Sequence, residues 1–346
     1  MFNFSKLKLP IIQAPMAGGM NTPELASAVA NAGGVGSFGF AYSTPQQITE
    51  DLIATKALTN GPINANVFVF KPTHLPARKI QSAAIEALEN LPIEGEYSLS
   101  IPKEPFHPNL KTQLDPIWIQ RPAILTFHFG IPPQTVIEKA HSLGIVIGIT
   151  ATSIDEALAI EKAGGNFIVA QGIEAGGHRG VFNPEDQDDD LSLEELIAGI
   201  VKASHLPLVA AGAIMSGADI NRVLKLGAAA AQLGTAFLCC DETGISRSQK
   251  QFLLEAKNRK TTFTTSFSGR RAQGINNKFM QLMEGRPTLP FPMQNTLTGP
   301  IRKLAAKNND WEYQSLWAGR AYQHVRMMTA TQLMYELESE IKVAQK

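Results

Sequence analysis

Short apolar runs alternate with helical patterns over the first 240 residues, and this alternation constrains the fold more than any other feature of the chain. The first run, residues 11–16, is followed by Thr22-Pro23-Glu24, a typical helix start, and then by the helix stop Gly33-Gly34. Further strand-like runs lie at 35–40, 63–68, 123–128, 146–151, 166–169, 208–211 and 229–233. Eight βα repeats predict a (β/α)₈ TIM barrel, an α/β fold, because a doubly wound sheet does not require eight of them.

The regular alternation ends near residue 240. Residues 241–309 are polar and helix-like and then rich in proline, so we expect a small appended helical domain over the C-terminal face of the barrel. The last segment, from Trp311 onward, has a helical pattern and is expected to return to the barrel wall. The predicted division is therefore a barrel of residues 1–240 and 310–346 and a small domain of residues 241–309.

Composition narrows the class of protein. The chain has 346 residues, a formal net charge of +0 and 44% hydrophobic residues, which disfavours a nucleic-acid or membrane partner. No signal-peptide pattern or bilayer-spanning run is present in the sequence, so we predict a cytoplasmic protein. The only cysteines, Cys239 and Cys240, are adjacent and are interpreted as buried thiols. The acidic run at 186–190 is interpreted as a solvated loop, and no metal site is predicted. These patterns leave the oligomeric state open.

The loop at 170–180 carries the strongest functional signal. It follows the buried run 166–169 and is rich in glycine, which lets backbone approach a ligand closely. It also carries an amide, an imidazole and a cation, on Gln171, His178 and Arg179. The sequence therefore predicts a ligand site here, with an acid, a base or an anion anchor beside bare peptide groups.

Other predicted strand ends add polar groups at the same end of the barrel. Asn64 and Asn66 share one face of their strand and are expected to read the polar edge of a flat heterocycle. The Gly-rich turns 212–217 and 234–235 follow the last two strands, where barrels commonly bind phosphate. Together they indicate a phosphorylated ligand, although neither matches a Walker loop or a dinucleotide turn.

Four motifs resemble those of the nitronate monooxygenases, formerly called 2-nitropropane dioxygenases. They are Gln13-Ala14-Pro15-Met16-Ala17-Gly18-Gly19, the loop 170–180, Ala210-Ala211-Gly212-Ala213-Ile214, and the run 231–237. The likeness follows the order of the chain and extends to 267–270 and 315–319, which indicates the class I branch. The resemblance implies an FMN-dependent TIM barrel that acts on a small-molecule nitronate and dioxygen.

The resemblance also implies roles for individual residues. FMN contacts are expected from Met16, Asn66, Gln171, Gly176, Gly212, Ala213, Gly217, Gln232, Leu233, Gly234 and Thr235, with Gly212, Ala213 and Gly217 at the phosphate. His178 and His128 are expected on the substrate side of the flavin as the catalytic residues, with Arg179 as a supporting cation for the anionic nitronate.

The chain departs from the family pattern at two positions. Many relatives have Gly-Gly where this chain has Gly212-Ala213, so we expect phosphate binding to be kept if the φ of Ala213 is negative. Relatives often have Ala-Arg-Gly where this chain has Ala272-Gln273-Gly274, and the difference removes a cation near the site.

The implied reaction is the oxidation of an alkyl nitronate, such as propionate 3-nitronate, to a carbonyl compound and a nitrite-type product, a detoxification. The protein binds, orients and tunes the cofactor, which carries the redox chemistry. One alternative is an FMN-dependent enoyl-thioester reductase that uses NAD(P)H, since such enzymes have a similar barrel and Gly-Gly-His loop. Another is a non-catalytic flavin-binding module.

Overall fold

The eight predicted runs form parallel strands of a barrel in the computed structural model, which describes residues 2–345. The strand order is β1-β9-β8-β6-β5-β4-β3-β2, and a bridge between Ile12 and Val35 joins the two ends. The strands are Ile11–Gln13 (β1), Gly36–Gly39 (β2), Ile63–Phe68 (β3), Ile124–His128 (β4), Val146–Ala151 (β5), Phe167–Gln171 (β6), Leu208–Ala211 (β8) and Ala230–Leu233 (β9). Their order around the barrel follows the chain, so all the C-terminal ends open on one face.

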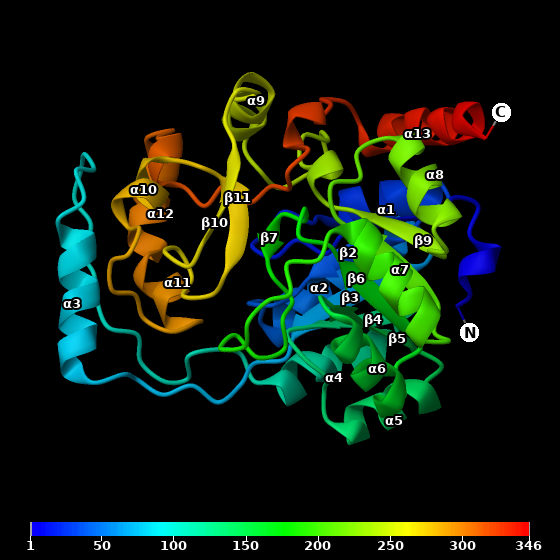
Figure 1. The fold of residues 1–346 in the computed structure, drawn as a ribbon, viewed down its shortest axis with the longest axis horizontal. Coiled ribbons are helices and arrows are strands. Elements are labelled where there is room, and N and C mark those ends of the chain that lie inside the picture. Colours follow the sequence, from blue (N-terminus) through cyan, green and yellow to red (C-terminus); the bar gives the residue numbers. More distant parts are fainter. Residues whose placement is uncertain (1, 346) are drawn as a thin grey trace.

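Helices cover the outside of this barrel (Figure 1). They are Pro23–Asn31 (α1), Pro45–Leu58 (α2), Leu110–Gln120 (α4), Gln134–Ser142 (α5), Ile154–Ala163 (α6), Leu193–Ala203 (α7), Gly217–Lys225 (α8) and Ala330–Ala344 (α13). Local sequence signals start several of them: the side chains of Thr22, Thr44 and Ser216 each accept a backbone N–H of the first turn. Short 3₁₀ turns lie at Phe4–Lys6, Thr235–Phe237, Trp311–Tyr313 and Tyr322–His324.

The chain returns to the barrel at its end, as the sequence predicts. Helix α13 packs against α8 and α1 and takes the place of the wall helix after β9. The Asn221 Nδ2 of α8 donates a hydrogen bond to the Ile341 carbonyl of α13 at 2.7 Å. Upstream, Cys239 and Cys240 are buried free thiols, as predicted.

A second lobe stands beside the barrel (Figure 1) and has its own apolar core. We define the lobe as residues 78–106 and 261–317. Its helices are Arg78–Glu89 (α3), Lys278–Leu282 (α10), Met293–Leu297 (α11) and Gly299–Lys307 (α12), and α9 (Arg247–Glu255) leads toward it. The core joins Leu88 of α3 to Phe279 and Ile301. The sequence patterns did not assign α3 to this unit; it belongs there because its one apolar face needs a partner surface.

A short antiparallel sheet ties the lobe to the barrel. Its order is β10-β11-β7, formed by Thr261–Thr264 (β10), Ala272–Ile275 (β11) and Gly177–His178 (β7). Strands β10 and β11 lie within residues 241–309, which were expected to be helical. The threonines of β10 favour the strand conformation. Because Ala272 pairs with His178, the lobe fixes the backbone of the Gly-rich loop. Within residues 2–345, no helix has the length and hydrophobicity needed to cross a membrane.

Candidate functional site

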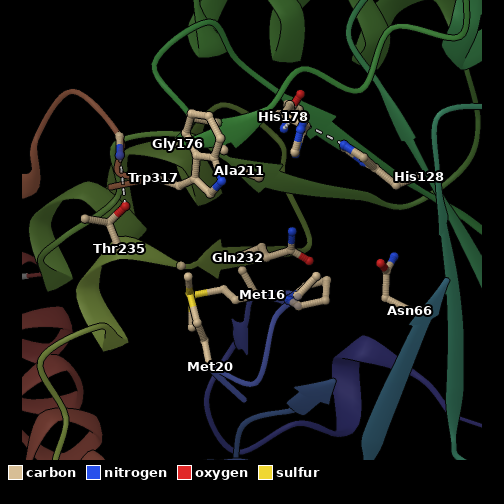
Figure 2. Close-up of a pocket in the computed structure, with 18 of the residues that line it drawn as sticks. Met16, Met20, Asn66, His128, Gly176, His178, Ala211, Gln232, Thr235 and Trp317 are labelled. Carbon is tan, nitrogen blue, oxygen red and sulfur yellow. Dashed lines mark hydrogen bonds between the residues drawn. The ribbon is translucent and has the colours of Figure 1, made fainter. Parts of the chain in front are cut away.

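A cavity of about 380 Å³ lies at the C-terminal ends of the strands, where barrel and lobe meet (Figure 2). Its volume falls within the range of small-molecule sites. The barrel side consists of strand ends and the loops that follow β1, β6, β8 and β9, and the lobe contributes Asn295, Arg302, Ser315 and Trp317. The cavity therefore joins the Gly-rich loops to groups from a separate part of the chain.

The structure gathers most of the predicted site residues around this cavity. The lining residues among them are Met16, Asn66, His128, Gln171, Gly176, His178, Gly212, Ala213, Gln232, Gly234 and Thr235. Leu233 does not line it, because alternation along β9 turns Gln232 to the pocket and Leu233 into the core. Gly217 does not line it either: its N–H donates to the Glu340 carboxylate at 2.6 Å, and it packs against α13.

The two histidines lie together at one end of the cavity (Figure 2). The His128 Nε2 is 3.2 Å from the His178 carbonyl oxygen, and the His178 Nε2 is 2.9 Å from the Ser268 Oγ. A carbonyl only accepts, so the Nε2 of His128 carries a proton. The Ser268 hydroxyl donates its one hydrogen to the Arg270 carbonyl at 3.0 Å, so the Nε2 of His178 also donates. In the neutral ring, the Nδ1 of His178 is then left as an acceptor.

Both imidazoles are held neutral. Burial, followed by repulsion from any proton on His128 and by the charges of Arg270 and Arg302, lowers the pKa of His178 to about 3. Burial and Arg270 likewise lower the pKa of His128 to about 3, against the opposing effect of its bond to the His178 carbonyl. Aromatic rings surround His178, with the ring centroids of Trp317 and Phe291 each at 5.5 Å. At neutral pH neither histidine supplies positive charge to the cavity.

The amide side chains divide into bracing and available groups. Gln171 braces the loop, because its Nε2 donates to the His178 carbonyl at 3.0 Å and its Oε1 accepts the Gly180 N–H at 2.8 Å. Asn66 Nδ2 donates to Thr126, and Asn64 lies two residues deeper in the barrel, where it bonds Ser37 and Thr126. The expectation that Asn64 reads a ligand is therefore wrong, since it does not reach the cavity. The side chain of Gln232 makes no hydrogen bond within residues 2–345 and lines the cavity.

The loop after β8 adopts an unusual backbone. Gly212 has a φ of 146° and Ala213 a φ of 50°, so the condition that Ala213 keeps a negative φ is not met. The backbone of Ala213 is therefore held in the left-handed region, which glycine adopts without strain and a residue with a side chain does not. The N–H groups of Gly212 and Ala213 have no hydrogen-bond acceptor within the described part of the chain. Such paired free N–H groups form a concavity suited to an anion.

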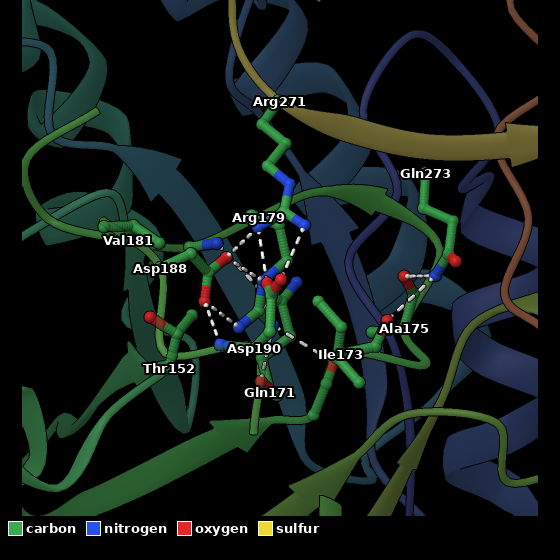
Figure 3. A network of polar contacts seen from close by, with 12 residues as sticks. Thr152, Gln171, Ile173, Ala175, Arg179, Val181, Asp188, Asp190, Arg271 and Gln273 are labelled. Carbon is green, nitrogen blue, oxygen red and sulfur yellow. Dashed lines mark hydrogen bonds and ion pairs between the residues drawn. The ribbon is translucent and has the colours of Figure 1, made fainter. Parts of the chain in front are cut away.

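Arg179 lies away from the cavity, in a polar network (Figure 3). Its side chain is 1% exposed, and its Nε and Nη2 contact the two Asp188 oxygens at 2.7 and 2.9 Å. Burial raises the pKa of Asp188, but the hydrogen bonds and charge of Arg179, with Arg271, lower it overall. The expected role of Arg179 as a substrate cation is therefore wrong, and Asp188 belongs to this buried pair rather than to a solvated loop.

Gln273, at the second departure from the family pattern, also has a structural role. Its Nε2 donates to the Ile173 and Ala175 carbonyls at 3.1 and 2.7 Å, which links β11 to the Gly-rich loop (Figure 3). Within residues 2–345 no group of three or more His, Cys, Asp or Glu side chains is arranged to hold a metal ion.

Several lining residues had no predicted role, namely Tyr42, Asn295, Arg302, Ser315 and Trp317. Ser315 and Trp317 lie in a motif that carried the family resemblance, so their presence had a signal. Arg302 had only a weak signal, an arginine beside the buried Ile301 on an otherwise ordinary amphipathic helix. Tyr42 and Asn295 had none: Tyr42 lies in the loop after β2, and Asn295 lies in the short helix α11, which reaches the cavity only through the packing of the lobe.

Comparison with known proteins places this arrangement in a family. The family model described as nitronate monooxygenase matches residues 1–340. A nitronate monooxygenase of Paraburkholderia phytofirmans is 40% identical over 342 residues, which covers 96% of this chain and 92% of that protein. The structure of a nitroalkane oxidase from Streptomyces ansochromogenes matches with a TM-score of 0.90 and 34% identity, over 99% of this chain and 98% of that one.

A more distant structure shares the fold alone. The enoyl reductase domain of MlnA from Bacillus amyloliquefaciens matches with a TM-score of 0.62 at 13% identity, over 98% of this chain and 96% of that one. A barrel of this kind supports several chemistries, so the site and not the fold must distinguish them.

Proposed function

Because this chain belongs to the nitronate monooxygenase family of flavin-dependent oxidoreductases, we propose that it binds FMN and oxidises alkyl nitronates with dioxygen. The products are a carbonyl compound and a nitrite-type nitrogen product. A cytoplasmic location stays a prediction from the sequence.

The fit of the cavity to FMN rests on the two Gly-rich loops. The free N–H groups of Gly212 and Ala213 suit the oxygens of a phosphate. A carbon built on Gly234 would lie 3.3 Å from the Ala14 Cβ, closer than an ordinary contact, and 4.0 Å from the sulfur of Met16, so the bare backbone lets a ligand approach closely there. The Gly319 N–H donates to Thr235 Oγ1 at 3.0 Å, which holds the 315–321 segment against the turn after β9.

The remaining lining groups suit the flat ring system. The Gln232 amide and the Asn66 Oδ1 face the cavity without protein partners within residues 2–345, and Met16 and Trp317 add apolar contact. FMN, when bound, supplies the acceptor for the electrons that leave the nitronate and the means of using dioxygen. The protein binds and orients both molecules and excludes water.

The observation that carries the proposal is the placement of the histidine pair, which lines the cavity close to the cations Arg270 and Arg302. A neutral nitroalkane must lose a proton, and a proton placed on His178 would create a cation beside Arg270 and Arg302. The site therefore favours a substrate that arrives already deprotonated. A nitronate is such a substrate, and its negative charge complements the nearby arginines.

An anaerobic reduction experiment tests the proposal. The purified protein, loaded with FMN, is mixed without oxygen with propyl 1-nitronate, with NADH or with NADPH, and flavin absorbance is followed. We expect the nitronate to bleach the flavin rapidly and both nicotinamides to do so slowly. Rapid bleaching by a nicotinamide without reaction of the nitronate supports the enoyl-thioester reductase, and no reaction with any of them supports a non-catalytic module. A protein that does not retain FMN contradicts the proposal at its first step.

A further inference from the structure

A second cavity, of about 650 Å³, lies at the opposite end of the barrel from the cavity at the barrel mouth. Two of its walls are the loops that lead into β3 and β4, so it lies at the N-terminal ends of these strands. The third wall is the N-terminal segment, which lies on the far side of the barrel from the lobe (Figure 1). We call this space the basal cavity, and its volume falls within the range of small-molecule sites.

Three cations and no carboxylate line the basal cavity. The cations are Lys6, Lys56 and Arg121, although the whole chain has a net charge of +0. Within residues 2–345, no carboxylate lies within 4.0 Å of any of them. The Lys56 Nζ donates to the carbonyl and the Oε1 of Gln120, the latter at 3.1 Å, whereas the side chains of Lys6 and Arg121 have no hydrogen-bond partner in the same part of the chain. The basal cavity therefore carries positive charge that the protein does not compensate.

The backbone of Arg121 shows that one of these cations is held in a strained position. Arg121 ends helix α4 with a φ of 46°, in the left-handed region. Glycine is the usual residue at such a helix end, because a side chain is strained there. An arginine near a helix C-terminus also offsets the helix dipole, but any position in the last turn provides that effect without strain. The chain therefore keeps a cation beside the basal cavity where glycine would suit the backbone better.

The walls of the basal cavity also offer apolar surface that is attached to the barrel. Phe2, Leu7 and Pro122 contribute to it. The ring of Phe2 contacts that of Phe4, and Phe4 in turn contacts Phe167 of β6, with 5.1 Å between the ring centroids in both pairs. An inorganic anion would use the cations alone, whereas a hydrocarbon chain would also cover this apolar surface. The combination therefore favours a molecule with both an acidic head and an apolar body.

We propose that the basal cavity binds a small amphipathic anion, with its acidic head at Lys6, Lys56 and Arg121 and its hydrocarbon body against Phe2 and Leu7. The site is separate from the cavity at the barrel mouth, so the inference does not depend on the proposed function. Arginine and lysine N–H groups donate short, charge-assisted hydrogen bonds to a carboxylate. Removal of the hydrocarbon chain from water adds to the affinity in proportion to the apolar area that is covered.

Calorimetry with matched probes tests the chemistry of the site. Octanoate is titrated into the FMN-loaded protein at low ionic strength, beside three relatives: acetate has the head without the chain, octanol has the chain without the charge, and octyltrimethylammonium has the opposite charge. We expect octanoate to bind with one-to-one stoichiometry and the other three to bind at least about tenfold more weakly, since each lacks one of the two contributions. Octyltrimethylammonium that binds as tightly as octanoate, or octanoate that does not bind, overturns the inference.

Variants of the lining cations locate the site. Arg121→Gly removes the guanidinium and suits the left-handed backbone, so the affinity for octanoate should fall by about threefold to tenfold without a loss of thermal stability. Lys6→Gln should cause a similar fall. The matched control is Lys8→Gln, because Lys8 belongs to the same segment but pairs with Glu338 and does not line the basal cavity. Arg302→Met alters the cavity at the barrel mouth and should also leave octanoate binding unchanged.

Three results with these variants and with lipid overturn the inference. Unchanged affinity in both Arg121→Gly and Lys6→Gln means that octanoate binds elsewhere. A loss of affinity in Arg302→Met alone places octanoate in the cavity at the barrel mouth. Sedimentation of the protein with phosphatidylglycerol vesicles, without binding of free octanoate, means that the cations contact a membrane surface instead of a small molecule.

Discussion

The two sides of the cavity are built differently. The barrel side offers backbone N–H groups, glycines and amides at strand ends, which follow directly from local motifs in the chain. The lobe side offers an arginine, a tryptophan and an asparagine, which reach the cavity only because a distant segment packs there. The barrel side suits a cofactor that many proteins share, and the lobe side suits the variable part of a substrate. Under the proposed function, this division separates cofactor binding from substrate selection in space.

Two arginines make the contrast concrete. Arg179, on the barrel side, is 1% exposed and is neutralised by Asp188 through two contacts. Arg302, on the lobe side, has only the neutral Asn295 as a hydrogen-bond partner within residues 2–345. An arginine therefore stabilises the fold through a buried ion pair in one place and remains available to a ligand in the other.

The largest effect is expected from breaking the buried pair. Asp188→Asn leaves Arg179 buried without its counter-charge, so the free energy of unfolding should fall by about 3–5 kcal/mol in urea denaturation. Asp190→Asn is the matched control: Asp190 also contacts Arg271 but is half-exposed, and its loss should change stability by less than about 1 kcal/mol. Equal, small losses in the free energy of unfolding for both variants would show that the Arg179–Asp188 pair does not stabilise the fold.

The next effect concerns the histidine at the border of the two sides. His178→Ala removes the free Nδ1 acceptor. Turnover of a neutral nitroalkane is expected to be slow already in the wild type, because a pKa lowered to about 3 makes His178 a weak base, and it should fall further, by about a hundredfold, when that acceptor is lost. Nitronate turnover should fall by less than about tenfold, since a nitronate needs no base and the arginines supply the charge. Because the pKa of His178 is lowered to about 3, kcat/KM for a preformed nitronate should show no inflection near pH 6.5. Equal losses for both substrates, at full FMN content, would favour a role in charge stabilisation.

A smaller effect is expected at the cofactor loop on the barrel side. Gly234→Val places a branched side chain where backbone and phosphate would meet, so the dissociation constant of FMN should rise by about tenfold to a hundredfold, as for other overpacked sites. Flavin fluorescence during titration of the apoprotein measures it. Gly299→Val adds the same side chain in α12, where a Cβ meets no atom within 4 Å, and should leave FMN affinity unchanged. An unaltered affinity in Gly234→Val would remove this loop from the phosphate site.

The smallest effect is expected from relief of strain in the neighbouring loop. Ala213→Gly removes a side chain from a left-handed backbone, with a gain of about 1–2 kcal/mol that the added freedom of the unfolded chain partly offsets. We expect a net gain of about 0.5 kcal/mol in the unfolding free energy of the apoprotein. Ala211→Gly, in the regular strand β8, should destabilise instead. If both variants lose stability to the same extent, the loop stores no strain.

The barrel side was largely predictable because its signals are local. A strand end, a glycine turn and a capping serine each depend on residues that are close in the chain, so the eight repeats and most of the cofactor-side residues could be located. The two errors there have different causes, one local and one tertiary. Leu233 lies on the opposite face of its strand from Gln232, and Gly217 is already bonded to a carboxylate from α13.

The sequence by itself determined the barrel, the position of the Gly-rich loops and the presence of two histidines near them. Only the tertiary structure decided which charges reach the ligand. It buried Arg179 against Asp188 and brought Arg302 from α12 into the cavity. It also joined α3 to the lobe and lowered the pKa of His178 through burial and neighbouring charges. The physical reason is that periodicity and turn chemistry act over a few residues, whereas burial and charge pairing depend on how whole segments pack against one another.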